Sequence, residues 1–164
     1  MVSINDKYGY IDKTGKQVIK PQYSGAFDFS EGLAMVKIAD KFGYIDKTGK
    51  IVVSPQFDDA ENFKEGLACV KLDSLFGYID KAGKFVIAPK FHSARSFSEG
   101  MAVVVNGGKY GYIDKTGKYV IGLKYTWAED FTEGLAKVNF SNDESNLDWG
   151  YVDKTGKVIW EPTK

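Results

Sequence analysis

Hydrophobic and polar residues alternate over short stretches of the chain, which is the pattern of half-buried β-strands. From residue 33 to 38 every side chain on one face is apolar. The stretch 42–46 places two aromatic residues on one face, and the stretch 50–54 is rich in β-branched residues and stops before Pro55. Proline cannot donate to a strand ladder, so we expect the third strand to end there. The pattern predicts a three-stranded antiparallel meander.

The connections between these stretches carry turn signals. Asp46-Lys47-Thr48-Gly49-Lys50 predicts a hairpin, because Asp can accept hydrogen bonds from the turn's amides and Gly can adopt the left-handed conformation. After the third strand, Phe57, Ala60 and Phe63 are spaced by three. That spacing predicts one short helical turn whose inner edge plugs the core.

The same pattern is repeated along the chain. The octapeptide Gly-Tyr-Ile-Asp-Lys-Thr-Gly-Lys returns, with one substitution in each of two copies, from starting positions Gly9, Gly43, Gly77, Gly111 and Gly150. A second marker, Glu-Gly-(Leu/Met)-Ala, keeps the 34-residue step of the first four copies and starts at Glu31, Glu65, Glu99 and Glu133. Such repetition indicates units that share their burial with their neighbours.

We therefore predict one all-β domain, 1–164, made of five tandem three-stranded antiparallel meander repeats of about 34 residues. The approximate units are 1–31, 32–65, 66–99, 100–133 and 134–164. Because the chain starts and ends in the same phase of the repeat, we expect an open twisted β array. The alternative is a closed five-bladed, propeller-like ring, which is often sealed by a strand exchanged between its ends.

Composition narrows the possible functions. The chain has 22 Lys plus Arg and 22 Asp plus Glu, so no global field favours nucleic acid or an anionic membrane. The single cysteine, Cys69, excludes an internal disulfide and lies in a predicted strand, where a buried hydrophobe is expected. The first residues carry no basic head or apolar stretch, and no segment reaches membrane-spanning length. We expect a cytoplasmic protein without membrane insertion, or an envelope or extracellular one if the sequence is trimmed from an exported protein.

The repeated unit resembles the bacterial WG-repeat family. The likeness lies in an aromatic residue before Gly-Tyr-Ile-Asp-Lys-Thr-Gly-Lys, then Val-Ile, Pro-x-aromatic, Ala and Phe-x-Glu-Gly-Leu-Ala-x-Val. The family's Trp is kept only at Trp149, and other aromatic residues replace it at Tyr8, Phe42, Phe76 and Tyr110. The resemblance implies a β-rich repeat protein with no established chemistry of its own.

No constellation of catalytic residues is evident. His92 is the only histidine, and neither a second His nor a Cys stands beside it in the sequence, so we predict neither a catalytic nor a metal site and no cofactor. The repeated aspartates could form a carboxylate ladder for cations, but each stands where a hairpin needs an acceptor. We expect a protein that is not an enzyme.

Charged side chains recur at equivalent points of the units. If the units stack in register, lysines of the hairpin turns form a basic edge and acids of the loops form the opposite edge. A basic stripe could bind an anionic partner, although lysines also protect sheet edges from aggregation. The insertion at 139–148 lengthens the connection between the first two strands of the last unit by five residues. It is polar and acidic, and is either a partner contact or a tolerated bulge. The hypothetical partner-binding residues are Lys13, Lys16, Lys47, Lys50, Lys81, Lys84, Lys115, Lys118, Asp143 and Glu144.

Two aromatic rows offer the other candidate surface. One row follows the glycine of each octapeptide (Tyr10, Tyr44, Tyr78, Tyr112 and Tyr151), and the other precedes it. We expect these rings to form the core. The function predicted from the sequence is a non-enzymatic scaffold with an extended surface for protein–protein interaction. The alternative is an envelope carbohydrate-binding module, which would need the aromatic rows to face solvent.

Overall fold

A computed structural model describes residues 1–141 and 148–161, and the chain is all-β. The described residues contain no helix. The chain forms two compact units, residues 1–74 with 78–85 and residues 75–77 with 86–164. The expectation of a single domain stays a prediction.

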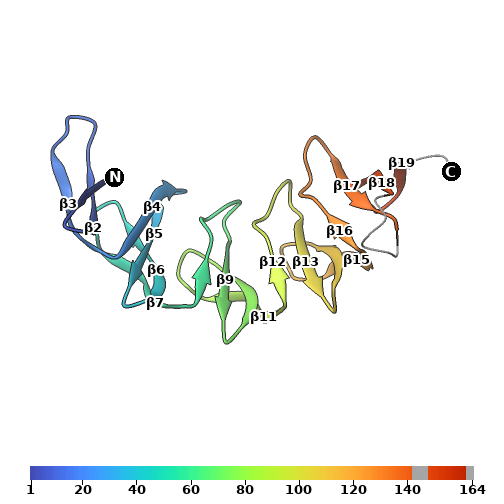
Figure 1. Ribbon diagram of the computed structural model, residues 1–164, viewed down its shortest axis with the longest axis horizontal. Helices are drawn as coiled ribbons and strands as arrows, with labels where there is room; N and C mark the ends of the chain where they lie inside the picture. The colour runs from blue at the N-terminus through green and yellow to red at the C-terminus, as the bar shows by residue number, and fades with distance from the viewer. Residues whose placement is uncertain (142–147, 162–164) are drawn as a thin grey trace. The chain divides into compact units, whose positions relative to one another are not determined.

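Five antiparallel sheets follow one another along the chain (Figure 1). The first sheet has three strands, β1 (Val2–Ile4), β2 (Lys7–Ile11) and β3 (Gln17–Tyr23). The second contains β4 (Gly25–Ser30), β5 (Leu33–Ile38), β6 (Lys41–Asp46) and β7 (Ile51–Phe57). The third contains β8 (Asp59–Ala60), β9 (Ala68–Leu72), β10 (Leu75–Ile79) and β11 (Phe85–Phe91).

The fourth and fifth sheets repeat this order. The fourth contains β12 (Ser93–Ala94), β13 (Ala102–Asn106), β14 (Lys109–Ile113) and β15 (Tyr119–Tyr125). The fifth contains β16 (Trp127–Ala128), β17 (Leu135–Asn139), β18 (Trp149–Asp153) and β19 (Val158–Trp160). Each sheet uses only strands that are consecutive in sequence, so the predicted all-β class and the five antiparallel meanders are confirmed.

The loop after the third strand differs from its prediction. It contains no helical turn, and its alanine instead pairs with the next strand, as Ala60 does with Val70. In the second sheet Ala26 pairs with Val36 and Phe29 with Ala34, so two residues of β4 lie opposite one residue of β5. This bulge turns residues spaced by three to the same side of an extended chain. The sheets after the first therefore have four strands, and each begins one strand before the predicted unit.

Pro55 does not end its strand, contrary to the prediction. Strand β7 continues to Phe57, and the pairing jumps from Tyr44 with Val53 to Phe42 with Phe57. Pro55 lies inside this irregularity, where the ladder is interrupted and a missing donor costs little. A Cβ on Gly43 would lie 2.6 Å from the carbonyl oxygen of Val53 and 2.7 Å from the nitrogen of Pro55. The glycine between the two aromatic residues is thus required by the close approach of β6 and β7.

The core lies between successive sheets. In the first unit, one face of the second sheet, with Leu33, Met35 and Tyr44, packs on Ala68 and Val70 of the third sheet. The plugging loop closes the edge of this layer, because Phe63 lies against Tyr44 with ring centroids 4.8 Å apart. In the second unit Tyr112 and Phe131 make the same contact at 4.8 Å. The second and the fourth sheet therefore each need the next sheet to bury this face, which we call the outward face of a sheet.

Candidate functional site

The hairpin turns hold the lysines proposed from the sequence, and the aspartate of each turn organises it. The Asp46 carboxylate accepts hydrogen bonds from the Thr48 hydroxyl at 2.6 Å, the Thr48 amide at 2.8 Å and the Lys50 amide at 3.1 Å. These bonds, with that of the Thr48 hydroxyl the strongest, lower the pKa of Asp46. Gly49 has φ 87°, in the left-handed region. The predicted turn-capping roles of Asp and Gly are confirmed.

A second turn, which occurs in the first four repeats, carries a glutamate in a strained conformation. Glu31 has φ 51° and the following Gly32 has φ 93°, as in the tight turns that join hairpin strands. A residue with a side chain is disfavoured there by about 1–2 kcal/mol, and Asn, Asp or Gly is the usual choice. Glu65, Glu99 and Glu133 have the same conformation at φ 53°. An interaction of the longer side chain is therefore expected to offset the strain.

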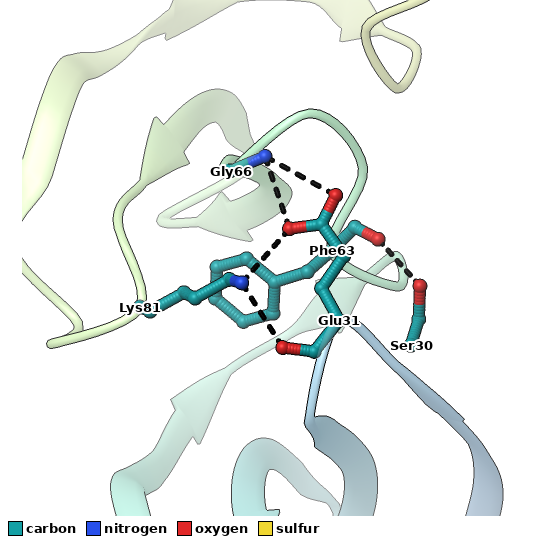
Figure 2. Close-up of polar contacts among 5 residues, drawn as sticks. All are labelled: Ser30, Glu31, Phe63, Gly66 and Lys81. Carbon is teal, nitrogen blue, oxygen red and sulfur yellow. Dashed lines mark hydrogen bonds and ion pairs between the residues drawn. The ribbon is translucent and has the colours of Figure 1, made fainter.

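Glu31 provides that interaction by reaching from the second sheet to two turns of the third (Figure 2). Its carboxylate accepts a hydrogen bond from the Gly66 amide at 3.1 Å and lies 3.1 Å from the Lys81 ammonium. Lys81 also donates to the carbonyl oxygen of Glu31 at 3.0 Å, and the Ser30 hydroxyl donates to the carbonyl oxygen of Phe63 at 2.6 Å. Partial burial would raise the pKa of Glu31, but the bonds from Lys81 and Gly66 outweigh it and lower the pKa. We call the Glu–Gly–Lys set of contacts the clasp.

The second unit contains an equivalent clasp. The Glu99 carboxylate accepts a hydrogen bond from the Gly134 amide at 2.9 Å and lies 3.0 Å from the Lys154 ammonium. Ser98 donates to the carbonyl oxygen of Phe131 at 2.8 Å, as Ser30 does to Phe63. The hydrogen bonds from Lys154 and Gly134 lower the pKa of Glu99. The clasp is thus a repeated device that fastens one sheet to the next.

The clasp changes how the lysine stripe is interpreted. Lys81 and Lys154 lie beside glutamates, so the expected separation of a basic and an acidic edge does not hold at these two residues. Of the eight lysines of the stripe, all of them exposed, Lys81 is the one placed in a described clasp. The eight are among the ten residues proposed for partner binding: Lys13, Lys16, Lys47, Lys50, Lys81, Lys84, Lys115 and Lys118. The other two, Asp143 and Glu144, lie outside the described residues, as does most of the insertion.

The aromatic row after the octapeptide glycine is mainly core, as expected. Tyr10, Tyr44, Tyr78 and Tyr112 are buried, whereas Tyr151 of the last sheet is 39% exposed. The hydroxyl groups of three of them donate to carbonyl oxygens that follow the third strand of the meander, at Phe27, Glu61 and Glu129. Burial raises the pKa of Tyr10 to about 12. This row therefore cannot serve as a stacking platform except at Tyr151.

The row before the glycine is half-buried and, in the second unit, borders a groove. The groove has a volume of about 580 Å³ and is lined by Val105, Gly108, Tyr110, Thr126, Trp127, Glu129, Asn139 and Trp149. We call it the aromatic groove. The rings of Tyr110 and Trp127 have centroids 5.3 Å apart, and Trp127 is 41% exposed. Ligand sites are commonly of this volume, with apolar walls and a few polar groups.

Cationic and polar groups surround the aromatic groove. The Arg95 guanidinium lies 5.6 Å from the ring centroid of Trp127, and the Lys137 ammonium lies 4.5 Å from that of Trp149. Asn139 is buried and accepts a hydrogen bond from the Ser141 amide at 3.1 Å. The groove thus combines exposed aromatic faces with fixed polar groups. This arrangement can hold a ligand that has both apolar and polar parts.

Comparison with known proteins assigns the repeats. A family model described as WG containing repeat matches five segments, 8–42, 42–75, 76–110, 110–142 and 149–163. The chain belongs to the WG-repeat family. The glycine that follows the aromatic residue in each WG repeat is the one whose missing Cβ lets two strands approach, as shown for Gly43. No protein of curated function matches the sequence.

Solved structures give distant likenesses to this WG-repeat chain. A chain in the structure of S. cerevisiae Dbp5 bound to Nup159, Gle1, IP6 and ADP is 12% identical, with a TM-score of 0.50 over 80% of this chain and 41% of that chain. A protein of unknown function from Bacteroides caccae is 14% identical, with a TM-score of 0.38 over 95% and 74%. A plant lectin from Cicer arietinum is 15% identical, with a TM-score of 0.33 over 78% and 84%. At these identities a likeness concerns the fold alone.

The remaining sequence candidates have structural roles in the WG repeats. His92 is exposed, and its Nδ1 accepts a hydrogen bond from the Gly107 amide at 3.3 Å. Cys69 is buried, and burial raises the pKa of its thiol. Among the described residues no group of three or more His, Cys, Asp or Glu side chains is placed to hold a metal ion. Within residues 1–141 and 148–161 there is also no helix that could cross a membrane.

Sequence reasoning missed the aromatic groove, although one signal was present. Trp127 stands where the other WG repeats have Gly25, Asp59 and Ser93. A large aromatic residue that replaces small or polar ones at an exposed position is not needed by the scaffold. That departure from the repeat could have identified the site.

Proposed function

We propose that this WG-repeat chain is a non-enzymatic scaffold that binds a protein partner, and that the aromatic groove is its main contact site. The observation that carries the proposal is the groove of Tyr110, Trp127 and Trp149, in which Trp127 replaces the small or polar residue of the other repeats. Trp, Tyr and Arg dominate the binding energy of protein interfaces when they lie in a pocket. Arg95, whose guanidinium lies 5.6 Å from the ring centroid of Trp127, adds a fourth residue of these types.

The scaffold supports such a role physically. Sheets fastened by clasps and shared cores hold Tyr110, Trp127 and Trp149 on strands rather than on loops, which limits the ordering cost of binding. The exposed second lysines of the hairpins, Lys16, Lys50, Lys84 and Lys118, belong to the part of the proposed stripe for which no clasp is described. They are proposed as a weaker, salt-dependent contribution to the encounter with an acidic partner.

The test is quantitative capture of proteins at physiological salt by the wild type and by Trp127→Ser, the residue found at this position in the fourth sheet. Tyr119→Ser is the matched control, because Tyr119 is 38% exposed in the same unit and does not line the groove. We expect Trp127→Ser to capture about tenfold less of the specific partner protein, or less still, which is the loss typical of a central aromatic contact. The control variant should capture as much as the wild type. Equal retention by both variants would refute the groove as the contact site.

The hairpin lysines need a separate experiment. We expect the combined change of Lys16, Lys50, Lys84 and Lys118 to Glu to slow association with an acidic partner and to abolish its dependence on salt. Association rates of the wild type and the variant are compared at low and at high salt. Unchanged rates would remove the lysine stripe from the account and leave the groove intact.

A glycan is the second candidate ligand, and the polar groups beside the rings favour it. The exposed carboxylate of Glu129 lines the groove next to Trp127 and Trp149. A sugar ring needs both an apolar face to cover and acceptors for its hydroxyls. Titration of tryptophan fluorescence with a panel of glycans decides the matter. A saturating change that Trp127→Ser removes supports the glycan, and no change with any glycan eliminates it.

A further inference from the structure

The outward face of the last sheet exposes apolar side chains. The residues at the equivalent positions of the fourth sheet are buried. Leu135 is 36%, Tyr151 39% and Trp160 56% exposed. Strand pairing shows the equivalence, because Tyr112 pairs with Val103 and Ile121, while Tyr151 pairs with Lys137 and Trp160. The residues at these places in the fourth sheet, Met101, Tyr112 and Ile121, are all buried.

A hollow marks this outward face. It has a volume of about 290 Å³ and is lined by Glu129, Asp130, Thr132, Glu133, Leu135, Lys137 and Tyr151. In the fourth sheet the corresponding place beside Tyr112 is filled by Phe131 and Val138 of the sheet that follows. The last sheet therefore presents the same surface as an inner sheet, without its cover.

The first sheet presents the complementary face. Ile4 is 56% and Ile11 39% exposed, and Val2 is half-buried. In the second sheet the corresponding residues Val36 and Ile45 are fully buried against Tyr10 and Ile19. The first sheet thus has the apolar surface that each later sheet uses to cover the one before it.

The charges of the clasp are also divided between these two faces. Glu133 has the strained conformation of Glu31 and Glu99, but among the described residues its carboxylate contacts no cation. Lys13 occupies in the first hairpin the place that Lys81 and Lys154 occupy in later ones. In the described part of the chain Lys13 pairs with no carboxylate. One half of a clasp is present on each face.

We propose that a second copy of this chain docks head to tail, with the Val2, Ile4 and Ile11 face of its first sheet on Leu135, Tyr151 and Trp160 and its Lys13 beside Glu133. We infer a second copy as the partner because this contact would repeat the interface that the chain already forms between the fourth and fifth sheets. The same inference follows from the opposite charges of the two half-clasps. Such a contact is heterologous, so it extends into chains of copies or closes into a ring of copies.

Lys137 limits the strength of this association. It stands where Met35, Cys69 and Val103 are buried in the earlier repeats. A lysine on an otherwise apolar face opposes its burial, because the ammonium group must stay hydrated or paired. The association is therefore weak in the wild type and strengthened by Lys137→Met.

Sedimentation equilibrium of the full chain over a wide concentration range tests the proposal. We expect the wild type to associate in a concentration-dependent way. Lys137→Met should lower the dissociation constant by about tenfold or more, because a buried ammonium no longer opposes contact. Lys13→Glu and Glu133→Lys should each weaken association, and the double charge swap should restore it. Lys47→Glu is the matched control, since Lys47 has the same place in the second hairpin and should leave association unchanged. Circular dichroism confirms that each variant is folded.

Three results would overturn the proposal. One is a monomeric wild type and a monomeric Lys137→Met at millimolar concentration. Another is association that neither Lys13→Glu nor Glu133→Lys weakens, which would place the contact elsewhere. The third is a monomer in which Tyr151 is protected from chemical modification, which would indicate that the faces are covered within one chain. Trp127→Ser should associate like the wild type, so the outcome is independent of the groove.

Discussion

The outward faces of the fourth and fifth sheets are built from the same repeat but are buried to very different extents. Tyr112 is fully buried and its hydroxyl donates to the carbonyl oxygen of Glu129, whereas Tyr151 is 39% exposed. Both side chains stand on the middle strand of a meander. The difference shows that burial in this fold comes from the neighbouring sheet rather than from the sheet that carries the residue. Residues at the same repeat position can therefore contribute differently to the free energy of unfolding.

The largest expected difference between the two faces is in the loss of stability when each tyrosine is truncated. Tyr112→Ala should lower the free energy of unfolding by about 3–5 kcal/mol, because a large buried ring leaves a cavity. Tyr151→Ala should lower it by less than about 1 kcal/mol, as at other surface positions. Urea unfolding followed by circular dichroism measures both midpoints, provided that the slopes agree. Equal losses would show that the two faces do not differ.

A second prediction concerns the effect on stability of the close backbone approach at Gly111, the residue before Tyr112. A Cβ on Gly111 would lie 2.7 Å from the carbonyl oxygen of Ile121, so Gly111→Ala should destabilise the chain by about 1–3 kcal/mol. Gly122, on the facing strand, has no neighbour within 4 Å of a Cβ, so Gly122→Ala is the control and should be neutral or slightly stabilising. Thermal unfolding of the two variants is compared. A harmless Gly111→Ala would contradict the close approach of the strands.

A third change compares the two clasp glutamates. Glu99→Gln keeps an acceptor for the Gly134 amide but loses the ion pair with Lys154, so it should lower the thermal midpoint slightly. Glu133→Gln should leave the midpoint unchanged in dilute monomer, because no cation lies against its carboxylate in the described residues. The measurement is thermal unfolding at low ionic strength, repeated at high salt. An equal effect of both substitutions would argue against the clasp.

The smallest expected effect is on the pH dependence of stability. Hydrogen bonds from Lys154 and Gly134 lower the pKa of Glu99, so the folded chain binds this proton less readily than the unfolded chain. The clasp should stabilise the fold above the unfolded pKa of about 4.3 and lose this contribution as pH falls through the lower folded value. The difference in stability between wild type and Glu99→Gln should be constant at neutral pH and shrink in acid. A difference that grew in acid would contradict the assignment.

Much of the fold could be predicted from the sequence because its signals are local. The hairpin at Asp46 to Lys50 depends on residues adjacent in the chain, and so does the strand that carries Tyr44, although the burial of Tyr44 needs the sheet that follows. The fourth strand was missed because pairing of Ala60 with Val70 is decided by a bulge rather than by periodicity. Pro55 was misplaced for the same reason.

The candidate site was less predictable because its residues are brought together by packing. The clasp joins Glu31 to Gly66 and Lys81, and no spacing rule links these positions. The aromatic groove depends on Tyr110, Trp127 and Trp149 meeting across two sheets. A sequence can indicate that Trp127 departs from its repeat, but only the packing shows which residues it meets.

Modification of tyrosine side chains by nitration, followed by peptide mass spectrometry, tests the central claim most directly. At a concentration low enough to keep the chain monomeric, Tyr151 should be nitrated rapidly, as should the exposed Tyr119, while Tyr44, Tyr78 and Tyr112 react only after unfolding. That result would show that each sheet relies on the next for its burial. Nitration of Tyr112 and Tyr151 at the same rate in the folded chain would contradict it.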